Sequence, residues 1–501
     1  MRTPDLPRLL FCLVLLLPAA ATAAPAQPGA TAGQEKIIEL SVEDVALQVL
    51  QNNRDLRVHR LTPVIAGTFE KLERGVFDPE LFTEFAAARE RASETARSTG
   101  TQFDVEGRDT SAVAGLRQFL PTGTTLEGTL EQRRTISNRA PEQQTARLGL
   151  TVTQALLQGF GPAVNLVDVR QAQLEITASR YELRGFTEAL LAGAETAYWN
   201  FVLAREQIAI FESSLAVARQ QRDETELRIE VGLLPEVEAA AARAEVARRE
   251  QALIDARSLL EERRLRLLRL LDPAPGSTFD WRIRATSEPR LTPTPVTDLP
   301  DHLQLAGRMR PDLNEARLQR DRQTLETVVT RNGLLPKLDV FITLGKTGYA
   351  DSFGGSFREL DGNGYDLVAG LRLSRPLSNR AAEARHTAAR AGRRQVEEAL
   401  ANLSQLIRLD VRLAINELDR SRQQITASAA TRALQEKTLA AEKERFDVGA
   451  STTLLVAQAQ RDLLASRIAE IEAIVQYRLA LVNLYLAEGS LLERRGIRIG
   501  P

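Results

Sequence analysis

The stretch LRIEVGLLPEVEAAAARAEVA, residues 227–247, decides the fold, because a Val-Gly pair interrupts a run that otherwise favours helix. A related stretch, ERFDVGASTTLLVAQAQRDLL, covers residues 444–464. Glycine costs about 1 kcal/mol relative to alanine inside a helix. The two glycines, Gly232 and Gly449, lie 449 − 232 = 217 residues apart. The same costly interruption at two equivalent places indicates a structural turn in a duplicated unit.

Other pairs of segments support an internal duplication. RPDLNEARL at Arg310 echoes NRDLRVHRL at Asn53, with an offset of 312 − 55 = 257 between the shared aspartates. LRLSRPL at Leu371 echoes LTVTQAL at Leu150, with an offset of 371 − 150 = 221. The first unit therefore has 257 − 221 = 36 extra residues, which is room for one additional hairpin.

Each unit contains a very long helical run. Residues 163–234 hold no proline, and a helix from 162 to 230 would be roughly 100 Å long at 1.5 Å per residue. Its apolar positions step by four, three and four residues, as in a coiled-coil seam: Leu190, Ala194, Ala197 and Phe201. A shorter helix is predicted from 236 to about 271. Val-Gly is then the tip of an antiparallel helical hairpin; the alternative is one continuous kinked helix.

Strand patterns lie outside these runs. A helix with Ser41 as its N-cap is predicted from residue 41 to about 73, and a two-residue period follows from 81 to about 153. In TTLEGTLEQR, two leucines alternate with polar residues: Leu126 and Leu130 against Glu127, Thr129 and Glu131. VFITLGK and YDLVAGLRL alternate in the second unit, with glycine-rich turns expected at FGGSF and DGNGY. One face of such strands suits lipid.

The first residues have the pattern of an export signal. Arg2 and Arg8 flank a short apolar run, and Ala-Thr-Ala at 21–23 is a small-residue cleavage site. Cleavage after Ala23 is expected; an uncleaved anchor is the alternative. The only cysteine, Cys12, lies within this signal, too early for a lipid anchor. Residues 24–40 are expected to form a flexible N-terminal segment.

Composition disfavours several classes of function. The 501 residues include 65 basic and 66 acidic ones, a balance that argues against a nucleic-acid partner. The three histidines, His59, His302 and His386, are scattered without a metal-binding spacing. No catalytic residue, cofactor or metal site is predicted, and the chain is not expected to be an enzyme.

The chain resembles the TolC family of outer-membrane efflux and secretion channels over nearly its whole exported length. The resemblance rests on the duplication and on motifs in a fixed order: LSVEDVALQVLQNNRDL, LTVTQALLQG, AYWNFVLA, RIEVGLLPEV, RFDVGASTTLL and NLYLAEG. It implies a mainly α fold with a membrane β-barrel part. In that fold, long antiparallel helical hairpins and amphipathic strands of three chains form one α/β-barrel conduit.

The resemblance and the duplication together divide the chain. The expected parts are a signal peptide (1–23), a flexible segment (24–40), a first repeat (41–271), a Pro-rich equatorial linker (272–301), a second repeat (302–490) and a C-terminal tail (491–501). The extra hairpin, at about 111–133, either joins the barrel, giving six strands per chain instead of the four usual in the family, or folds outside it.

By the same resemblance, the chain is a passive duct in the cell outer membrane that extends into the periplasm. It would serve a tripartite efflux pump or a type I secretion system as a homotrimer. It would contact outer-membrane lipid and a periplasmic adaptor that links it to an inner-membrane pump. The adaptor-docking tips would be Val231, Gly232, Leu233, Val448, Gly449, Ala450 and Ser451.

The family closes its periplasmic entrance with residues just beyond each tip. The matching positions here are Glu238, Phe446, Leu455 and Gln458. Leu455 and Gln458 stand where the family has acids, so the resemblance implies a less anionic and more apolar constriction. Glu238 is either a pore residue or a solvated charge on a helix face. The alternative function is a periplasmic coiled-coil scaffold or adaptor without a membrane barrel.

Overall fold

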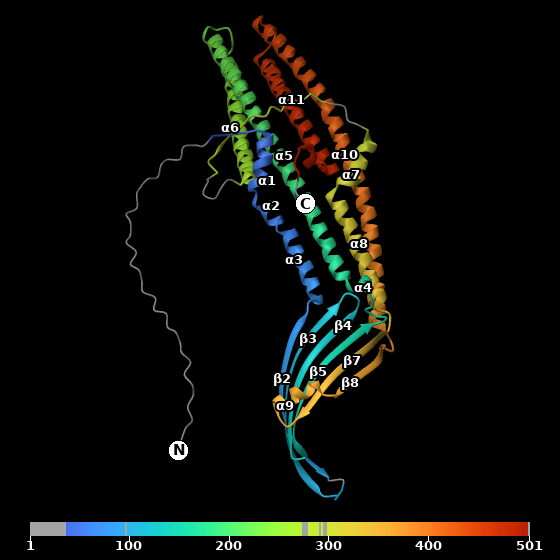
Figure 1. Cartoon of the computed structure of the whole chain (residues 1–501). Helices are drawn as coiled ribbons and strands as arrows, with labels where there is room; N and C mark the ends of the chain where they lie inside the picture. Colours follow the sequence, from blue (N-terminus) through green and yellow to red (C-terminus); the bar gives the residue numbers. More distant parts are fainter. Residues whose placement is uncertain (1–36, 96–97, 273–278, 290–291, 294–297, 499–501) are drawn as a thin grey trace, which may run out of the picture.

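A computed structural model describes residues 37–95, 98–272, 279–289, 292–293 and 298–498. The described parts form a helical rod joined end to end with a curved antiparallel sheet (Figure 1). The helices are α1 (Val42–Asn52), α2 (Arg54–His59), α3 (Thr62–Arg74), α4 (Pro162–Asn165), α5 (Val167–Glu230), α6 (Val237–Leu271), α7 (Leu299–Met309), α8 (Pro311–Asn332), α9 (Phe353–Arg358), α10 (Arg380–Asp447), α11 (Thr453–Glu488) and α12 (Leu491–Arg494). The strands are β1 (Ile37–Leu40), β2 (Glu80–Thr95), β3 (Gln102–Leu120), β4 (Thr124–Ser137), β5 (Ala140–Ala155), β6 (Arg282–Ala285), β7 (Lys337–Ala350) and β8 (Tyr365–Ser374).

Two helical hairpins build the rod, which confirms the hairpin interpretation over a continuous kinked helix. Helix α5 has 64 residues and packs along α6, and α10 has 68 residues and packs along α11. Both tips lie at the end of the rod opposite the sheet (Figure 1). The expected seam of α5 is buried at Ala194 and Phe201. Within the described residues, no helix combines the length and apolarity that crossing a bilayer requires.

The sheet contains six strands in the order β2-β3-β4-β5-β7-β8, with every neighbouring pair antiparallel. The first repeat contributes four strands and the second repeat two. The extra hairpin is β3–β4, with its turn at residues 121–123, and it is hydrogen-bonded to β2 on one side and to β5 on the other. It therefore belongs to the sheet, as expected if the hairpin joins the barrel strands and does not fold outside them.

The two faces of the sheet differ in polarity, as the alternating pattern predicts. Leu130 of β4 is paired with Leu148 of β5, and Leu150 is paired with Leu344 of β7, so these leucines share one face. Leu126, Ile342, Leu367, Leu371 and Leu373 extend this apolar face, which Lys346 interrupts. The opposite face carries Glu127, Thr129 and Glu131, together with two ion pairs, Arg117–Glu127 at 2.8 Å and Arg147–Asp366 at 2.6 Å.

The single helix expected over 41–73 is wrong, because three helices occupy this segment. Ser41 caps α1 as expected, and its hydroxyl accepts the amide of Asp44 at 3.1 Å. At Asn53 the chain leaves helical geometry, and the side-chain oxygen of Asn53 caps α2 through the amide of Leu56 at 3.0 Å. The side-chain nitrogen of Asn53 donates to the carbonyl of Leu270 at 3.2 Å. A contact with a distant helix therefore fixes the break.

Residues 37–40 differ from the flexible segment expected over 24–40. They form strand β1, which pairs in parallel with β6 inside the expected linker 272–301. The carbonyl of Leu40 accepts the hydroxyl of Tyr198 at 3.1 Å, and that hydroxyl oxygen accepts the amide of Ser287 at 3.0 Å. The expected signal peptide, residues 1–23, lies outside the described residues.

The loop between β7 and β8 also differs from the expectation of two glycine-rich turns. FGGSF forms the short helix α9, which a 3₁₀ turn follows at Glu359–Asp361. Helix α9 packs against β7, where a Cβ atom at Gly348 would lie 2.1 Å from the carbonyl oxygen of Ser356. Only glycine permits this close approach of helix to strand.

The largest core cluster lies midway along the rod, where α1, α5, α6 and α11 meet strands β1 and β6. Tyr198, Trp199 and Leu268 are among its most deeply buried side chains. The expected C-terminal tail also packs here, because Leu491 and Leu492 of α12 are buried in a neighbouring cluster. The middle of the rod therefore anchors both hairpins.

Candidate functional site

The two hairpin tips have the same backbone geometry. Gly232 and Gly449 adopt φ values of +76° and +77°, in the left-handed region that favours glycine. The amide of Leu233 donates to the carbonyl of Arg228 at 2.8 Å. In the second tip, the amide of Ala450 donates to the carbonyl of Arg445, also at 2.8 Å. With the bonds Gly232–Ile229 at 2.9 Å and Gly449–Phe446 at 3.0 Å, each tip is a Schellman motif.

The side chains around the tips are largely apolar and exposed. Val231 is 61% exposed, Leu233 72% and Val448 79%. Ala450 is exposed, and Ser451 is half-buried. The expected docking residues therefore lie together at the end of the rod opposite the sheet (Figure 1). Such a surface suits contact with another protein.

A feature that the sequence analysis missed joins the two tips. The Arg228 guanidinium of α5 lies 2.9 Å from the Asp447 carboxylate of α10 and 4.9 Å from the centre of the Phe446 ring. The ring of Phe446 is buried. The signal for this link is visible in the sequence, because each tip has an arginine four residues before its glycine and an acid two residues before it.

The expected entrance residues fall into two groups. Phe446 lies under the Arg228 link just before the second tip. Glu238, Leu455 and Gln458 lie in the first two turns of the return helices α6 and α11. Glu238 is half-buried, Leu455 is 44% exposed, and Gln458 is exposed. A cleft of about 240 Å³, lined in part by Glu224, Phe446 and Lys443, separates α5 from α10 beside the second tip.

Buried carboxylates cluster near the middle of the rod. Glu195 of α5 is fully buried and receives two hydrogen bonds from Arg495, at 2.7 and 2.5 Å. Glu488 is equally buried and contacts His302 of α7 and Ser490. These contacts tie the C-terminal turn to α5 and α7.

The negative charge of a third buried carboxylate, Glu188, is only partly balanced by nearby positive charge. Burial raises the pKa of the Glu188 carboxyl to about 7, although Arg184, at 3.1 Å, acts in the opposite direction. Arg184 also binds Glu493 at 2.6 Å, and that second carboxylate further raises the pKa of Glu188. Glu188 therefore changes its charge near neutral pH.

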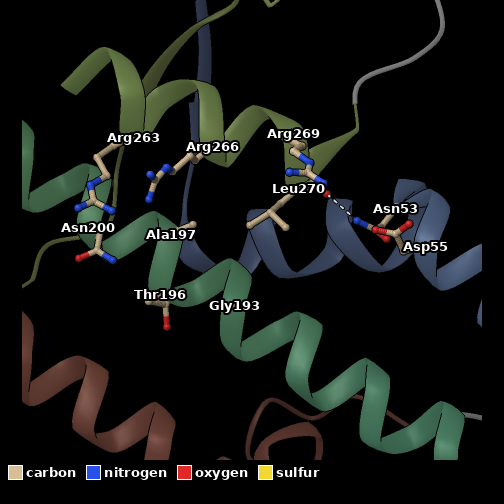
Figure 2. Close-up of a pocket in the computed structure, with 10 residues that line it drawn as sticks. All are labelled: Asn53, Asp55, Gly193, Thr196, Ala197, Asn200, Arg263, Arg266, Arg269 and Leu270. Atoms are coloured by element: carbon tan, nitrogen blue, oxygen red, sulfur yellow. Dashed lines mark hydrogen bonds between the residues drawn. The ribbon is translucent and has the colours of Figure 1, made fainter. Parts of the chain in front are cut away.

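A cavity of about 580 Å³ lies beside this region, between α6, α5 and the α1–α2 junction (Figure 2). Figure 2 shows Arg263, Arg266 and Arg269 along one side of α6, facing Asn200 and Asp55. Their spacing of three residues places them on one helix face, a signal that the sequence analysis did not use. Guanidinium groups of this kind bind carboxylates or phosphates.

The histidines occupy three separate places in the fold. His59 stacks on Phe186, His302 contacts Glu488, and His386 of α10 lies 3.2 Å from the Thr330 hydroxyl. Among the described residues, no group of three or more His, Cys, Asp or Glu side chains is placed to hold a metal ion.

Both the family comparison and the solved structures relate this chain to outer-membrane channels. The family model described as outer membrane efflux protein matches residues 302–490, which span the expected second repeat. No curated protein matches the chain. Among solved structures, the outer-membrane channel OprN is 18% identical, with 90% of each chain covered and a TM-score of 0.67.

Two further solved structures are similarly close. The outer membrane channel CmeC of Campylobacter jejuni is 16% identical, with 90% of this chain and 86% of that chain covered and a TM-score of 0.65. The outer membrane channel MtrE of Neisseria gonorrhoeae, in its open state, is 18% identical, with 90% and 89% covered and a TM-score of 0.64. The second repeat thus matches the outer membrane efflux protein family, and the whole chain has the fold of the TolC-type outer-membrane channels that its sequence resembles.

Proposed function

We propose that this chain is one subunit of a trimeric efflux channel, a passive conduit that crosses the outer membrane and extends through the periplasm. The observation that carries the proposal is the direct connection of a sheet with one apolar face to a pair of helical hairpins whose tips lie at the far end. At 1.5 Å per residue, the 68 residues of α10 extend about 100 Å.

The edges of the sheet support sharing between copies. Strands β2 and β8 are its two open edges, and they run in opposite directions, so β8 of one copy can pair with β2 of the next in an antiparallel ladder. Open edges cannot remain unpaired in lipid. Three copies with six strands each would close a barrel of eighteen strands, a size that leaves an aqueous channel.

The helical layer next to the sheet also has faces for a neighbouring copy. The segment that runs from α2 through α3 into the following 3₁₀ turn exposes apolar side chains that step by three or four residues: Val58, Leu61, Ile65, Phe69, Leu72 and Val76. At the other edge of the layer, α10 exposes Leu406, Leu409 and Leu413 with the same spacing. Each stripe is a half of a coiled-coil seam that a second copy would complete.

At the tips, the uncharged surface around Gly232 and Gly449 would dock a periplasmic adaptor, and through it an inner-membrane pump. Glu238, Phe446, Leu455 and Gln458 would then line or support the entrance. The duct itself would catalyse no reaction. Service to a tripartite efflux pump and service to a type I secretion system are both compatible with this arrangement.

The deciding experiment is fractionation of cells that express the full chain, followed by native mass measurement of the purified protein. A trimer in the outer-membrane fraction, whose gel mobility shifts on heating, supports the channel. A monomer or dimer in the soluble periplasmic fraction would instead support the coiled-coil scaffold and rule the channel out. Cys12 is the only native cysteine, so a reporter cysteine at an outer loop can test surface exposure in intact cells.

A further inference from the structure

The basic residues on the apolar face of the sheet all lie toward one end. The pairing register fixes which strand residues share the face that holds Leu130 and Leu148. In the described strands, the basic residues of this face lie in the half of each strand that is farther from the helical rod: Arg89, Arg91, Arg108, Arg134 and Lys346. The half nearer the rod has no basic strand residue on this face.

The stretch of this face between the rod and the basic residues has the height of a membrane. In β2, the residues of this face that precede Arg89 are uncharged: Leu81, Thr83, Phe85 and Ala87. Leu81 and Arg89 are 89 − 81 = 8 residues apart. This separation is about 27 Å along the strand, or roughly 21 Å of height at a tilt of about 40°. The apolar band of a membrane β-barrel is about 25 Å tall. In the proposed channel, the basic residues therefore lie at the level of the outer headgroups.

Two of these arginines lie directly opposite each other. The register pairs Arg89 of β2 with Arg108 of β3 on the same face. Paired side chains of this kind have Cβ atoms about 4.5–5.5 Å apart, and like charges at that separation are unfavourable. Both arginines are exposed, and neither forms an ion pair within the described part of the chain. Arg134 of β4 lies beside them, because its partner Thr110 is two residues from Arg108.

The acidic residues of this face leave the three-strand cluster positively charged. Glu106 contacts Arg91 at 3.5 Å, one cross-strand pair farther from the rod. Glu142 of β5 contacts Arg134 at 2.6 Å. Asp104 is four residues beyond Arg108, about 13 Å along the strand. Four arginines therefore face two nearby acids, and the pair Arg89–Arg108 lacks a counter-ion from the described chain.

The other side of the sheet marks the same level. Lys346 of β7 is paired with Tyr365 of β8, whose side chain is 79% exposed. Tyrosine is typical of the headgroup level of a membrane protein. Two residues beyond Lys346, the short helix α9 packs over this face at Gly348. The apolar band therefore ends at Lys346 on this side and at Arg89 on the other.

We propose that Arg89 and Arg108, assisted by Arg134, form a binding site for the phosphate group of an outer-leaflet lipid. The planar guanidinium group matches a phosphate through paired hydrogen bonds, and a phosphate placed between Arg89 and Arg108 turns their repulsion into two attractive contacts. The acyl chains of the lipid would then lie along Phe85 and its cross-strand partner Ala112, toward the rod. The inference rests on the proposed function, because the channel places this face in lipid.

Lipid titration of the purified, full-length trimer in detergent tests the site, with bound lipids counted by native mass spectrometry. Phosphatidic acid, whose headgroup is a bare phosphate, should bind more tightly than phosphatidylcholine, whose phosphate carries a choline group. Arg89→Gln/Arg108→Gln should weaken the binding of phosphatidic acid by about 10-fold to 100-fold, because charge-assisted hydrogen bonds are lost. The matched control, Arg133→Gln/Arg147→Gln, removes two charges at a similar level of the polar face and should leave both affinities unchanged.

Three results would overturn the lipid site. They are equal binding of the two lipids by the wild type, equal losses in the two double variants, and an affinity for inorganic phosphate as high as that for phosphatidic acid. If the double variant does not assemble, Arg108→Gln alone should weaken phosphatidic acid binding by about 3-fold to 10-fold, and an unchanged affinity has the same meaning. A protein that forms no membrane trimer would instead refute the proposed function.

Discussion

The two repeats agree closely in their hairpins and disagree in their strands. Both hairpins turn through a Schellman motif with a glycine at nearly the same φ. In the sheet, the first repeat supplies four strands and the second supplies two. The difference shows which part of the unit tolerates insertion: a hairpin can be added within a sheet without disturbing the register of its neighbours. A change of length at a tip would move every contact along the seam of the hairpin.

The largest expected effect is the loss of export when both tips are altered, which tests whether the two tips dock the adaptor equally. Leu233→Glu and Ala450→Glu, combined, should leave the trimer intact and abolish export, because a charge would be buried against the adaptor. Crosslinking to the adaptor and an export assay measure this. The two single variants compare the tips directly. Equal partial losses of export would mean that both tips dock the adaptor. Wild-type export in the combined variant would reduce the tips to simple turns.

The next prediction compares the extra hairpin with the strands that both repeats share. Leu130→Lys in β4 and Leu344→Lys in β7 put a charge on the apolar face and should each destabilise the barrel by about 2–4 kcal/mol near the bilayer midplane. Assembly measured by heat-modifiable mobility should fall sharply. Thr129→Lys and Thr343→Lys, on the polar face, are the controls. A mild effect at Leu130 beside a severe one at Leu344 would mean that β3–β4 does not face lipid.

The third prediction concerns Glu188→Gln, a substitution that gives the first repeat the residue type found at the equivalent position of the second. Glu188 corresponds to 188 + 217 = 405, which is Gln405. The folded-state pKa of Glu188, about 7, exceeds the reference value of 4.5, so its contribution to stability is present below that reference value and is lost as pH rises through 7. At about pH 8, Glu188→Gln should be more stable than the wild type by up to ~3 kcal/mol.

Thermal unfolding of the purified protein, followed by helical circular dichroism at about pH 5 and about pH 8, measures this difference. The unfolding midpoint of the variant should depend less on pH than that of the wild type. Glu493→Gln removes the neighbouring acid that raises the pKa of Glu188, so the loss of stability should move to lower pH than in the wild type. Parallel pH profiles for the wild type and Glu188→Gln would contradict the prediction.

The smallest expected effect is the loss of hairpin stability when the glycine of each tip is replaced by alanine. Gly232→Ala and Gly449→Ala add a Cβ atom in open space, so only the positive φ is unfavourable. Each substitution should destabilise its hairpin by about 1 kcal/mol, to a similar extent at both tips. Hydrogen exchange of the last turn of α5 and of α10 measures the effect locally. A large difference between the tips would mean that one glycine has a further role in contact.

The sequence predicts those features that local chemistry determines. A glycine that ends a long helix and an alternation of leucine with polar residues need no knowledge of distant parts. The helical hairpins were therefore predicted with nearly correct bounds, as were the strand region 81–153 and the strands at VFITLGK and YDLVAGLRL. The break at Asn53 could not be predicted, because it depends on the carbonyl of Leu270. The pairing of β1 with β6 joins segments about 245 residues apart, with no local signal. The Arg228–Asp447 link required the two tips to be placed side by side.

The extra hairpin has a consequence for the width of the duct. Strands are about 4.8 Å apart, so six strands tilted by about 40° span roughly 38 Å of circumference, whereas four would span roughly 25 Å. The helical layer above the sheet contains α3, α5, α8 and α10 side by side, and helices spaced about 9 Å apart span roughly 36 Å. In the proposed trimer, the sheet and the helical layer of each subunit therefore have matching arcs. The bore of that trimer would continue into the membrane at nearly constant diameter, without a funnel where helix passes into strand.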